Sequence, residues 1–151
     1  MPSKRAAVTM TEAEVREFLD APRSMALATH GADGGIHQVA MWYGFVDDRL
    51  AMTSFSRSQK VVNLRRDPRF SVLVEAGDTY ATLRGVHMRG TAELLEDLDQ
   101  VVAVVEAVGP RYARPGDLPA DPRRAAAGRV AILFDVTHTA SWDHSKLGGG
   151  Y

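Results

Sequence analysis

The chain has 151 residues, 45% of them hydrophobic and 25% charged, which is typical of one globular domain whose core is large enough to fold unaided. It contains no cysteine, so disulfides, thiolate nucleophiles and cysteine-based metal or iron–sulfur sites are excluded. A net charge of −1 argues against nucleic-acid or membrane binding through bulk charge, and we find no signal peptide or membrane-length apolar run, so a cytoplasmic protein is expected.

The first half of the chain predicts one helix followed by three strands. Residues 9–20 are expected to form an amphipathic helix, because Thr11 and Glu14 make a capping box and Pro22 ends the apolar pattern. Short apolar or alternating runs separated by turn residues then predict strands. These strands are expected at residues 24–29, 36–43 and 50–53, with the first two joined as a hairpin through the glycine-rich residues 31–35.

The second half predicts two helices and three strands. A helical period returns at residues 56–66, where Ser56 or Ser58 can cap a helix that ends at Asp67-Pro68. Val61, Val62 and Leu64 are expected to face inward. A valine-rich helix is expected at residues 98–108, and strands at residues 69–75, 81–93 and 129–141, with Gly85 and Gly90 marking a bulge or bend in the second of these.

This order of elements predicts a mostly-β fold. About six antiparallel strands with three short helices favour a closed or nearly closed barrel, because open strand edges otherwise need cover. The strands follow one another too closely for βαβ crossovers. No repeat or long linker divides the sequence, so residues 1–151 are expected to form a single domain, with an N-terminal helix within residues 1–22 and a C-terminal tail at residues 142–151.

Residues 53–60, Thr-Ser-Phe-Ser-Arg-Ser-Gln-Lys, are the sharpest local feature. They place hydroxyl groups and two cations where a strand ends and a helix begins. A helix N-terminus offers free backbone N–H groups and a partial positive charge, which suit a phosphate. Arg57 and Lys60 are three residues apart and can close on one anion. The same pattern also fits a capped surface helix with solvated charges, and the segment alone leaves both interpretations open.

Other motifs assign little chemistry. Trp42 and Tyr43 are neighbours in an expected strand, so one can pack inward while the other meets a ligand or partner. Trp142 has the same two interpretations, core or contact residue. The histidines have no metal-site spacing, and Rossmann and P-loop motifs are missing, so we assign no metal site and no catalytic residue. The basic residues 65–69 lack the interleaved aromatics of a nucleic-acid site.

Five segments carry a resemblance to a known family: residues 38–43 (Gln-Val-Ala-Met-Trp-Tyr), 53–60, 63–69 (Asn-Leu-Arg-Arg-Asp-Pro-Arg), 89–93 (Arg-Gly-Thr-Ala-Glu) and 141–151 (Ser-Trp-Asp-His-Ser-Lys-Leu-Gly-Gly-Gly-Tyr). They resemble the split-β-barrel superfamily of pyridoxamine 5'-phosphate oxidase-like proteins. The ending is most similar to the actinobacterial branch that uses the deazaflavin coenzyme F-420.

The resemblance implies a homodimer with cofactor sites at the subunit interface. It also implies hydride transfer from reduced F-420 to a conjugated or planar acceptor such as a quinone, a tetrapyrrole or an enone. An FMN-using oxidase or reductase is the alternative, and a non-catalytic carrier of the cofactor or of haem is a third. FMN-using members tend to carry a basic pair on the second strand. Residues 38–43 have none, which favours the deazaflavin.

The resemblance further implies three groups of site residues. The first group would hold the cofactor phosphate, the second would lie along the ring system, and the third would come from the other subunit to cover the ring or acceptor. The proton donor stays open between solvent and residues such as Arg57, Lys60 and Tyr151. The three groups are Thr53, Ser54, Arg57 and Lys60; Met41, Trp42 and Phe55; and Trp142, Lys146 and Tyr151.

Overall fold

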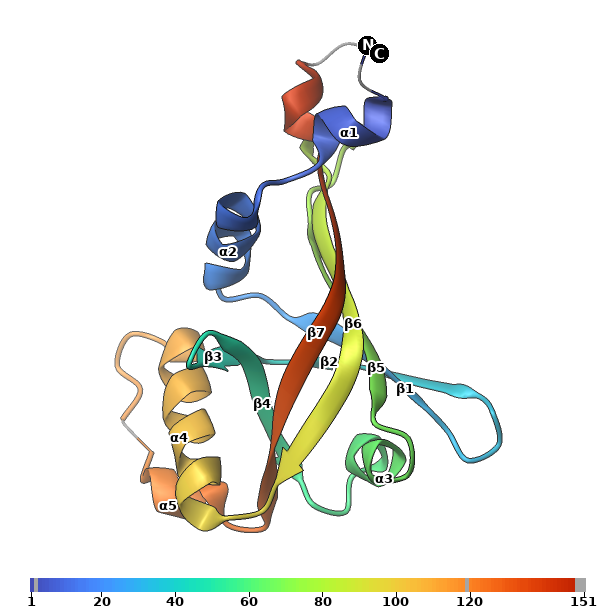
Figure 1. The fold of residues 1–151 in the computed structure, drawn as a ribbon. Coiled ribbons are helices and arrows are strands. Elements are labelled where there is room, and N and C mark those ends of the chain that lie inside the picture. The colour runs from blue at the N-terminus through green and yellow to red at the C-terminus, as the bar shows by residue number, and fades with distance from the viewer. Residues whose placement is uncertain (2, 119, 149–151) are drawn as a thin grey trace.

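The computed structural model describes residue 1, residues 3–118 and residues 120–148. Its strands form one seven-stranded antiparallel sheet in the order β2-β1-β5-β6-β7-β4-β3 (Figure 1). The elements are α1 (Lys4–Val8), α2 (Glu12–Asp20), β1 (Met25–His30), β2 (Ile36–Met41), β3 (Gly44–Val46), β4 (Arg49–Phe55), α3 (Gln59–Arg66), β5 (Arg69–Ala76), η1 (Tyr80–Thr82), β6 (Arg84–Leu95), α4 (Leu98–Val108), η2 (Gly109–Tyr112), α5 (Pro122–Ala126), β7 (Arg129–Asp143) and η3 (His144–Leu147).

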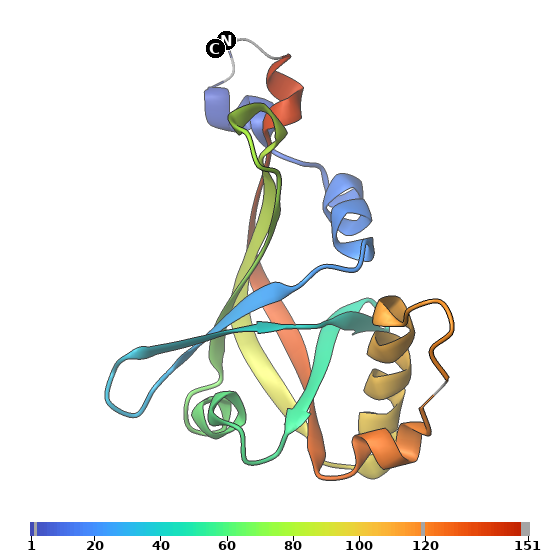
Figure 2. The same cartoon turned by 180° about the vertical axis from the view of Figure 1, so that it is seen from behind.

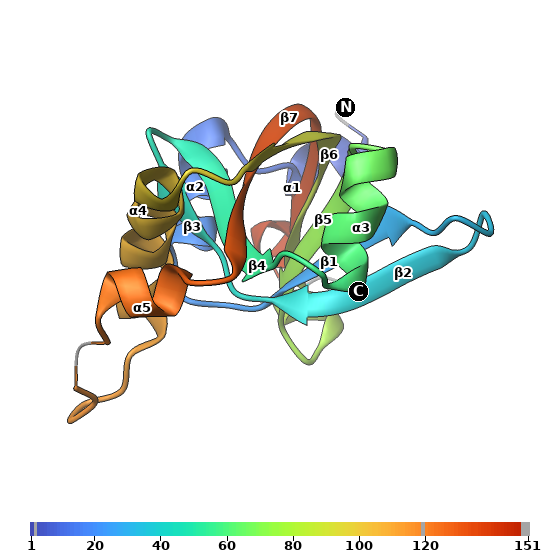
Figure 3. The ribbon, with the colours of Figure 1, turned by 90° about the horizontal axis from the view of Figure 1, so that it is seen from below.

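The sheet curves into a nearly closed barrel. Its two edge strands, β2 and β3, do not pair with each other in the described chain, but only Trp42 and Tyr43 separate them in sequence, so the end of β2 lies close to the start of β3. The view from below shows the strands curving round a common interior, with α3 on one side and α4 with α5 on the other (Figure 3). The mostly-β antiparallel barrel predicted from the sequence is therefore confirmed.

Two apolar clusters stabilise the barrel. The interior cluster includes Tyr43, Met25 and Ile132, each fully buried, and α3 adds Val61 and Leu64 to it. A second cluster lies outside β4 and β7, where α4 and α5 pack against them. Because both faces of this part of the sheet are covered, β7 has five consecutive buried residues, 130–134, instead of an alternating pattern.

The upper part of the sheet extends beyond the barrel. β4 pairs with β7 only from Arg129 to Leu133, so the rest of β7 pairs with β6 alone among the described strands. The extension carries α1 and η3 at its far end (Figures 1 and 2). The pairing of β6 with β7 shifts register between Arg89 and Gly90, close to one of the glycines where the sequence predicts a bulge.

Local signals in the sequence located most elements. The capping box of Thr11 with Glu14 is present at α2, and the valine-rich segment forms α4 over the expected residues. The prediction that Val62 faces inward is wrong, because its side chain is 43% exposed while Val61 and Leu64 on the same helix are buried. None of the described helices is long and apolar enough to cross a membrane.

Several short elements of the described chain were not predicted. They are α1, β3 and α5, of three to five residues each, and the short helices η1, η2 and η3, of which η1 occupies the start of the strand predicted at residues 81–93. The predicted strand at 36–43 ends earlier, at Met41, and β3 begins after Trp42 and Tyr43, beyond the predicted segment. α5 does carry sequence signals, because Asp121 caps it and Pro122 occupies its first turn. The proline-rich context of this segment obscured them.

Candidate functional site

The start of α3 is a polar corner where β4 ends. Ser58 occupies the N-cap position but makes no capping hydrogen bond, because its hydroxyl pairs instead with that of Ser54 at 2.9 Å. Lys60 donates from Nζ to the same Ser54 oxygen at 3.1 Å. The first turn of α3 therefore has no side-chain cap for its backbone N–H groups, and these groups are free to meet an anion.

Two cations meet at this corner without an acidic partner among the described residues. Burial lowers the pKa of Lys60, and the nearby charge of Arg129 lowers it further. Arg129 opens β7 directly opposite Phe55, and its guanidinium lies 4.2 Å from the centre of that ring. Two positive charges held close together without a carboxylate favour a bound anion between or beside them.

A pocket of about 260 Å³ adjoins this corner. Trp42 forms part of its wall and is 55% exposed. One face of the indole stacks on Tyr112, with ring centroids 4.6 Å apart and planes within 3°, which leaves the other face open to a planar ligand. The pocket is lined by Ala40 and Met41 from the end of β2, Trp42 from the connection that follows, Thr53 from β4, Val108 from α4, and Arg129 from β7.

Strand alternation divides the predicted phosphate residues between two faces of β4. Ser54 is 3% exposed and meets Lys60 and Ser58, whereas Thr53 lines the pocket beside Trp42. Arg129 connects the two sides, since it lines the pocket and also acts on the charge of Lys60. The arrangement can hold an anion at the start of α3 and a planar group against Trp42.

The remaining predicted site residues lie elsewhere in the protomer. Arg57 is exposed in the turn before α3, close to the corner in sequence, and makes no hydrogen bond or ion pair in the described part of the chain. Trp142 packs over Gly85 on the extension, and Lys146 donates from Nζ to Glu14 Oε2 at 2.6 Å. The chain thus does not bring Trp142 or Lys146 to its own pocket. Tyr151 falls outside the described residues.

No acid–base or metal chemistry is evident at the corner. The described residues contain no group of histidines and carboxylates able to hold a metal ion. The pocket is lined by apolar groups, a hydroxyl and a guanidinium, without a carboxylate or histidine. These residues suit binding and orientation of a ligand that supplies its own chemistry.

Two residues of the site escaped sequence analysis. The sequence pattern predicts Arg129 only as the first residue of an apolar strand. Its position beside Phe55 depends on the pairing of β7 with β4. Tyr112 lies in a proline-rich connection, and its hydroxyl holds the backbone at Arg23 and Tyr43 while its ring supports Trp42. Neither position has a local sequence signal.

Comparison with known proteins defines the class. The sequence model described as pyridoxamine 5'-phosphate oxidase matches residues 11–143, so the chain belongs to this family of split barrels, and the resemblance seen in the sequence is confirmed. A conserved hypothetical protein from Mycobacterium tuberculosis is 40% identical in sequence, with a TM-score of 0.90, over 99% of this chain and 95% of its own.

Other relatives of known structure differ in what they bind. An F-420 reductase is 25% identical over 93% of this chain and 98% of its own, with a TM-score of 0.67. An FAD- and haem-binding protein from Mycobacterium smegmatis has a TM-score of 0.71 over 93% of this chain and 79% of its own, and at 18% identity it shows the fold alone. A search of curated proteins found no match. Relatives with this fold thus include an F-420 reductase and an FAD- and haem-binding protein, so the ligand of this chain must be argued from the residues of its own site.

Proposed function

We propose that the protein binds coenzyme F-420 and directs hydride transfer from the reduced deazaflavin to a conjugated or planar small-molecule acceptor. The observation that carries this proposal is the polar corner itself. Within the described residues, Lys60 and Arg129 have no acidic partner there and the start of α3 has no side-chain cap, and the exposed ring of Trp42 lies beside them. The similarity to an F-420 reductase supports the choice of cofactor.

The cofactor phosphate fits the start of α3. Lys60 supplies a charged donor that is already positioned by its hydrogen bond to Ser54, so little side-chain freedom is lost when an anion binds. The backbone N–H groups of the first turn add donors in fixed directions. Arg129 provides a second charge from the opposite strand, and Arg57 can swing in from the exposed turn.

The ring fits the pocket beside Trp42. Stacking on Tyr112 fixes the indole plane, and Met41 with Val108 makes the remaining wall apolar. A bound deazaflavin supplies a hydride donor. The residues around it hold its plane, keep water away from one face and leave the other face for the acceptor. We assign no proton donor among them.

FMN remains the second candidate cofactor, and Arg129 is the observation that favours it. The sequence argument against FMN was that residues 38–43 contain no basic side chain. Arg129 lies in one pocket with Met41 and Trp42, so β7 supplies the cation that β2 lacks. That argument alone therefore does not separate the two cofactors, and binding measurements must.

Single-turnover oxidation separates an enzyme from a carrier. The protein would be loaded with reduced F-420 under anaerobic conditions and mixed with quinone, tetrapyrrole and enone acceptors, while the deazaflavin absorbance is followed. We expect at least one acceptor to oxidise the bound cofactor faster than it oxidises free cofactor. Tight binding without acceleration by any acceptor class would instead identify a cofactor carrier.

The exposed aromatic groups at the site support a homodimer. Trp42 is 55% exposed beside the pocket and Phe55 is 60% exposed at the polar corner, so two large aromatic side chains are open to solvent at one site. We propose that a second copy of the chain covers them and that its tail residues Trp142, Lys146 and Tyr151 approach the ring or acceptor. Sedimentation velocity should give a dimer. A monomer with full cofactor affinity would contradict this arrangement.

A further inference from the structure

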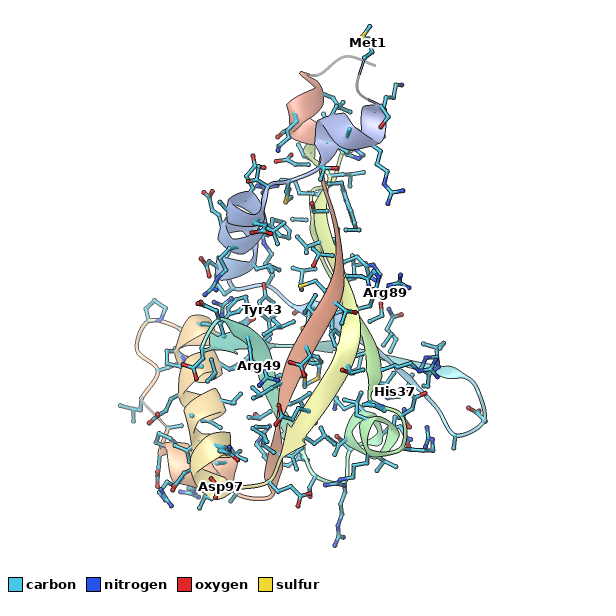
Figure 4. All side chains as sticks on the ribbon, in the orientation of Figure 1. Met1, His37, Tyr43, Arg49, Arg89 and Asp97 are labelled. Atoms are coloured by element: carbon cyan, nitrogen blue, oxygen red, sulfur yellow. The ribbon has the colours of Figure 1, made fainter. Side chains whose placement is uncertain are left out.

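A second pocket, of about 580 Å³, is lined by residues of β1, β2, β5, β6 and β7. It shares no residue with the pocket at Trp42, and no helix contributes to it. Its volume falls within the range of small-molecule sites. Figure 4 shows one of its residues, Arg89, projecting outward on the side of the extension away from α2.

Strand pairing gathers four basic side chains around this pocket. Arg89 is opposite His138 on β7, and on its other side it is opposite Ser71 on β5. Arg69 lies two residues before Ser71 and so is a diagonal neighbour of Arg89. Thr29 pairs with Phe70, which brings the next residue of β1, His30, beside Arg69. All four basic residues line the pocket.

The positive charge that these basic side chains bring to the pocket is not balanced within the described chain. Asp67 binds Arg69 through both carboxylate oxygens, at distances down to 2.6 Å, and so neutralises that guanidinium. The nearest acid on β7, Asp135, is held by Arg49 at 2.8 Å. Arg89 has no ion pair and no side-chain hydrogen bond among the described residues. No carboxylate lines the pocket.

A β-bulge shapes the same place. Arg89 pairs with His138 but Gly90 pairs with Val136, so Thr137 is an extra residue in β7. Its hydroxyl donates to the carbonyl oxygen of Arg89 at 3.3 Å. Adjacent strand residues normally face opposite ways, yet the bulge lets Thr137 and His138 both line the pocket. A side chain at Gly90 would collide with the carbonyl of Asp135, so the bulge requires glycine there.

We propose that this pocket binds a small organic carboxylate with an apolar body. Arg89 is the unpaired guanidinium that takes the carboxylate, in the fork geometry that arginine favours, and His138 and Ser71 flank it. Ala28 and Ile36 supply the apolar contact, and Ile36 is 64% exposed while the pocket is open. The site is independent of the cofactor, because it uses none of the residues proposed for cofactor binding.

Histidine NMR resonances provide a direct test, since His30 and His138 line the pocket and His144 lies at the far end of the extension. The full chain would be titrated with benzoate and, in parallel, with benzamide, its neutral analogue. We expect benzoate to shift His30 and His138 saturably without moving His144, and benzamide to have no such effect. Equal responses to the two probes, or no saturable shift with benzoate, would overturn the proposal.

Two arginine variants complete the test. Arg89→Gln should weaken benzoate binding about tenfold or more, the scale of one charged hydrogen bond. Arg114→Gln removes an exposed charge outside the pocket and should leave the affinity unchanged. The proposal fails if both variants bind like the parent. It also fails if Arg89→Gln changes the sedimentation coefficient instead of benzoate affinity, because this face would then be a contact between copies.

Discussion

Replacement of Lys60 by methionine should weaken cofactor binding without lowering the stability of the free protein. The substitution removes the charge but keeps an unbranched apolar side chain of similar length. In the free protein, burial and Arg129 both disfavour the charged amine, which is why its pKa is lowered. Loss of that charge should therefore leave the melting temperature unchanged or raise it, even though the hydrogen bond to Ser54 is also lost.

Cofactor affinity should change in the other direction. One charged hydrogen bond to a phosphate is worth about 1.5–3 kcal/mol, which corresponds to a roughly 10- to 150-fold increase in Kd. Fluorescence titration measures the affinity and thermal unfolding of the free protein measures the stability. Arg114→Met is the matched control, because it removes one positive charge away from the corner and should change neither quantity.

The result that would refute this reasoning is a loss of cofactor affinity together with a loss of stability. If Lys60→Met lowers the melting temperature and weakens binding together, Lys60 acts as a structural residue, and its effect on the cofactor is indirect. Unchanged affinity would remove the start of α3 from the phosphate site. Lys60→Arg keeps the positive charge and should retain most of the binding.

Three further predictions follow from the same contacts. The pKa of Lys60 lies below its ordinary value of 10.5, so the amine loses its charge at a lower pH than a free lysine does. F-420 affinity should therefore fall as pH rises through that lowered pKa. A pH series of titrations should show this fall in the parent protein and a flatter profile for Lys60→Met. Burial raises the pKa of Tyr43 from 10.0 to about 12, with a further contribution from Tyr112, so the folded state keeps this proton to a higher pH than the unfolded state does. The contribution of Tyr43 to the free energy of unfolding should be fully present below pH 10 and be lost as pH rises through about 12. Tyr43→Phe should remove this contribution from alkaline unfolding curves. Gly85→Ala places a methyl group against the indole of Trp142, so we expect a loss of about 1–3 kcal/mol in unfolding free energy and a changed tryptophan emission, whereas unchanged stability would mean that the ring moves freely.

Local sequence signals were sufficient where one element decides its own structure. The capping box fixed the start of α2, and Gly109-Pro110 marked the end of α4. The expectation that one of Trp42 and Tyr43 packs inward agrees with the structure, where the first is 55% exposed and the second fully buried, although both lie between β2 and β3 and not in a strand. Each of these signals lies within a few residues of the feature that it predicts.

The site required information that no local pattern contains. Arg129 and Lys60 are 69 positions apart in the chain and meet because β7 pairs with β4. The row of basic residues at the second pocket comes from four strands, and its shape depends on an extra residue in β7. Spacing along one segment cannot reveal either arrangement, because both depend on strand order and register.

Titration of the purified protein with oxidised F-420, and separately with FMN, tests the central claim most directly. Fluorescence of each cofactor would report binding at a fixed protein concentration. The account predicts saturable binding of F-420 with clearly lower affinity for FMN. Preference for FMN would contradict the deazaflavin assignment but keep the site, whereas binding of neither cofactor would contradict the proposed role of Lys60, Arg129 and Trp42 altogether.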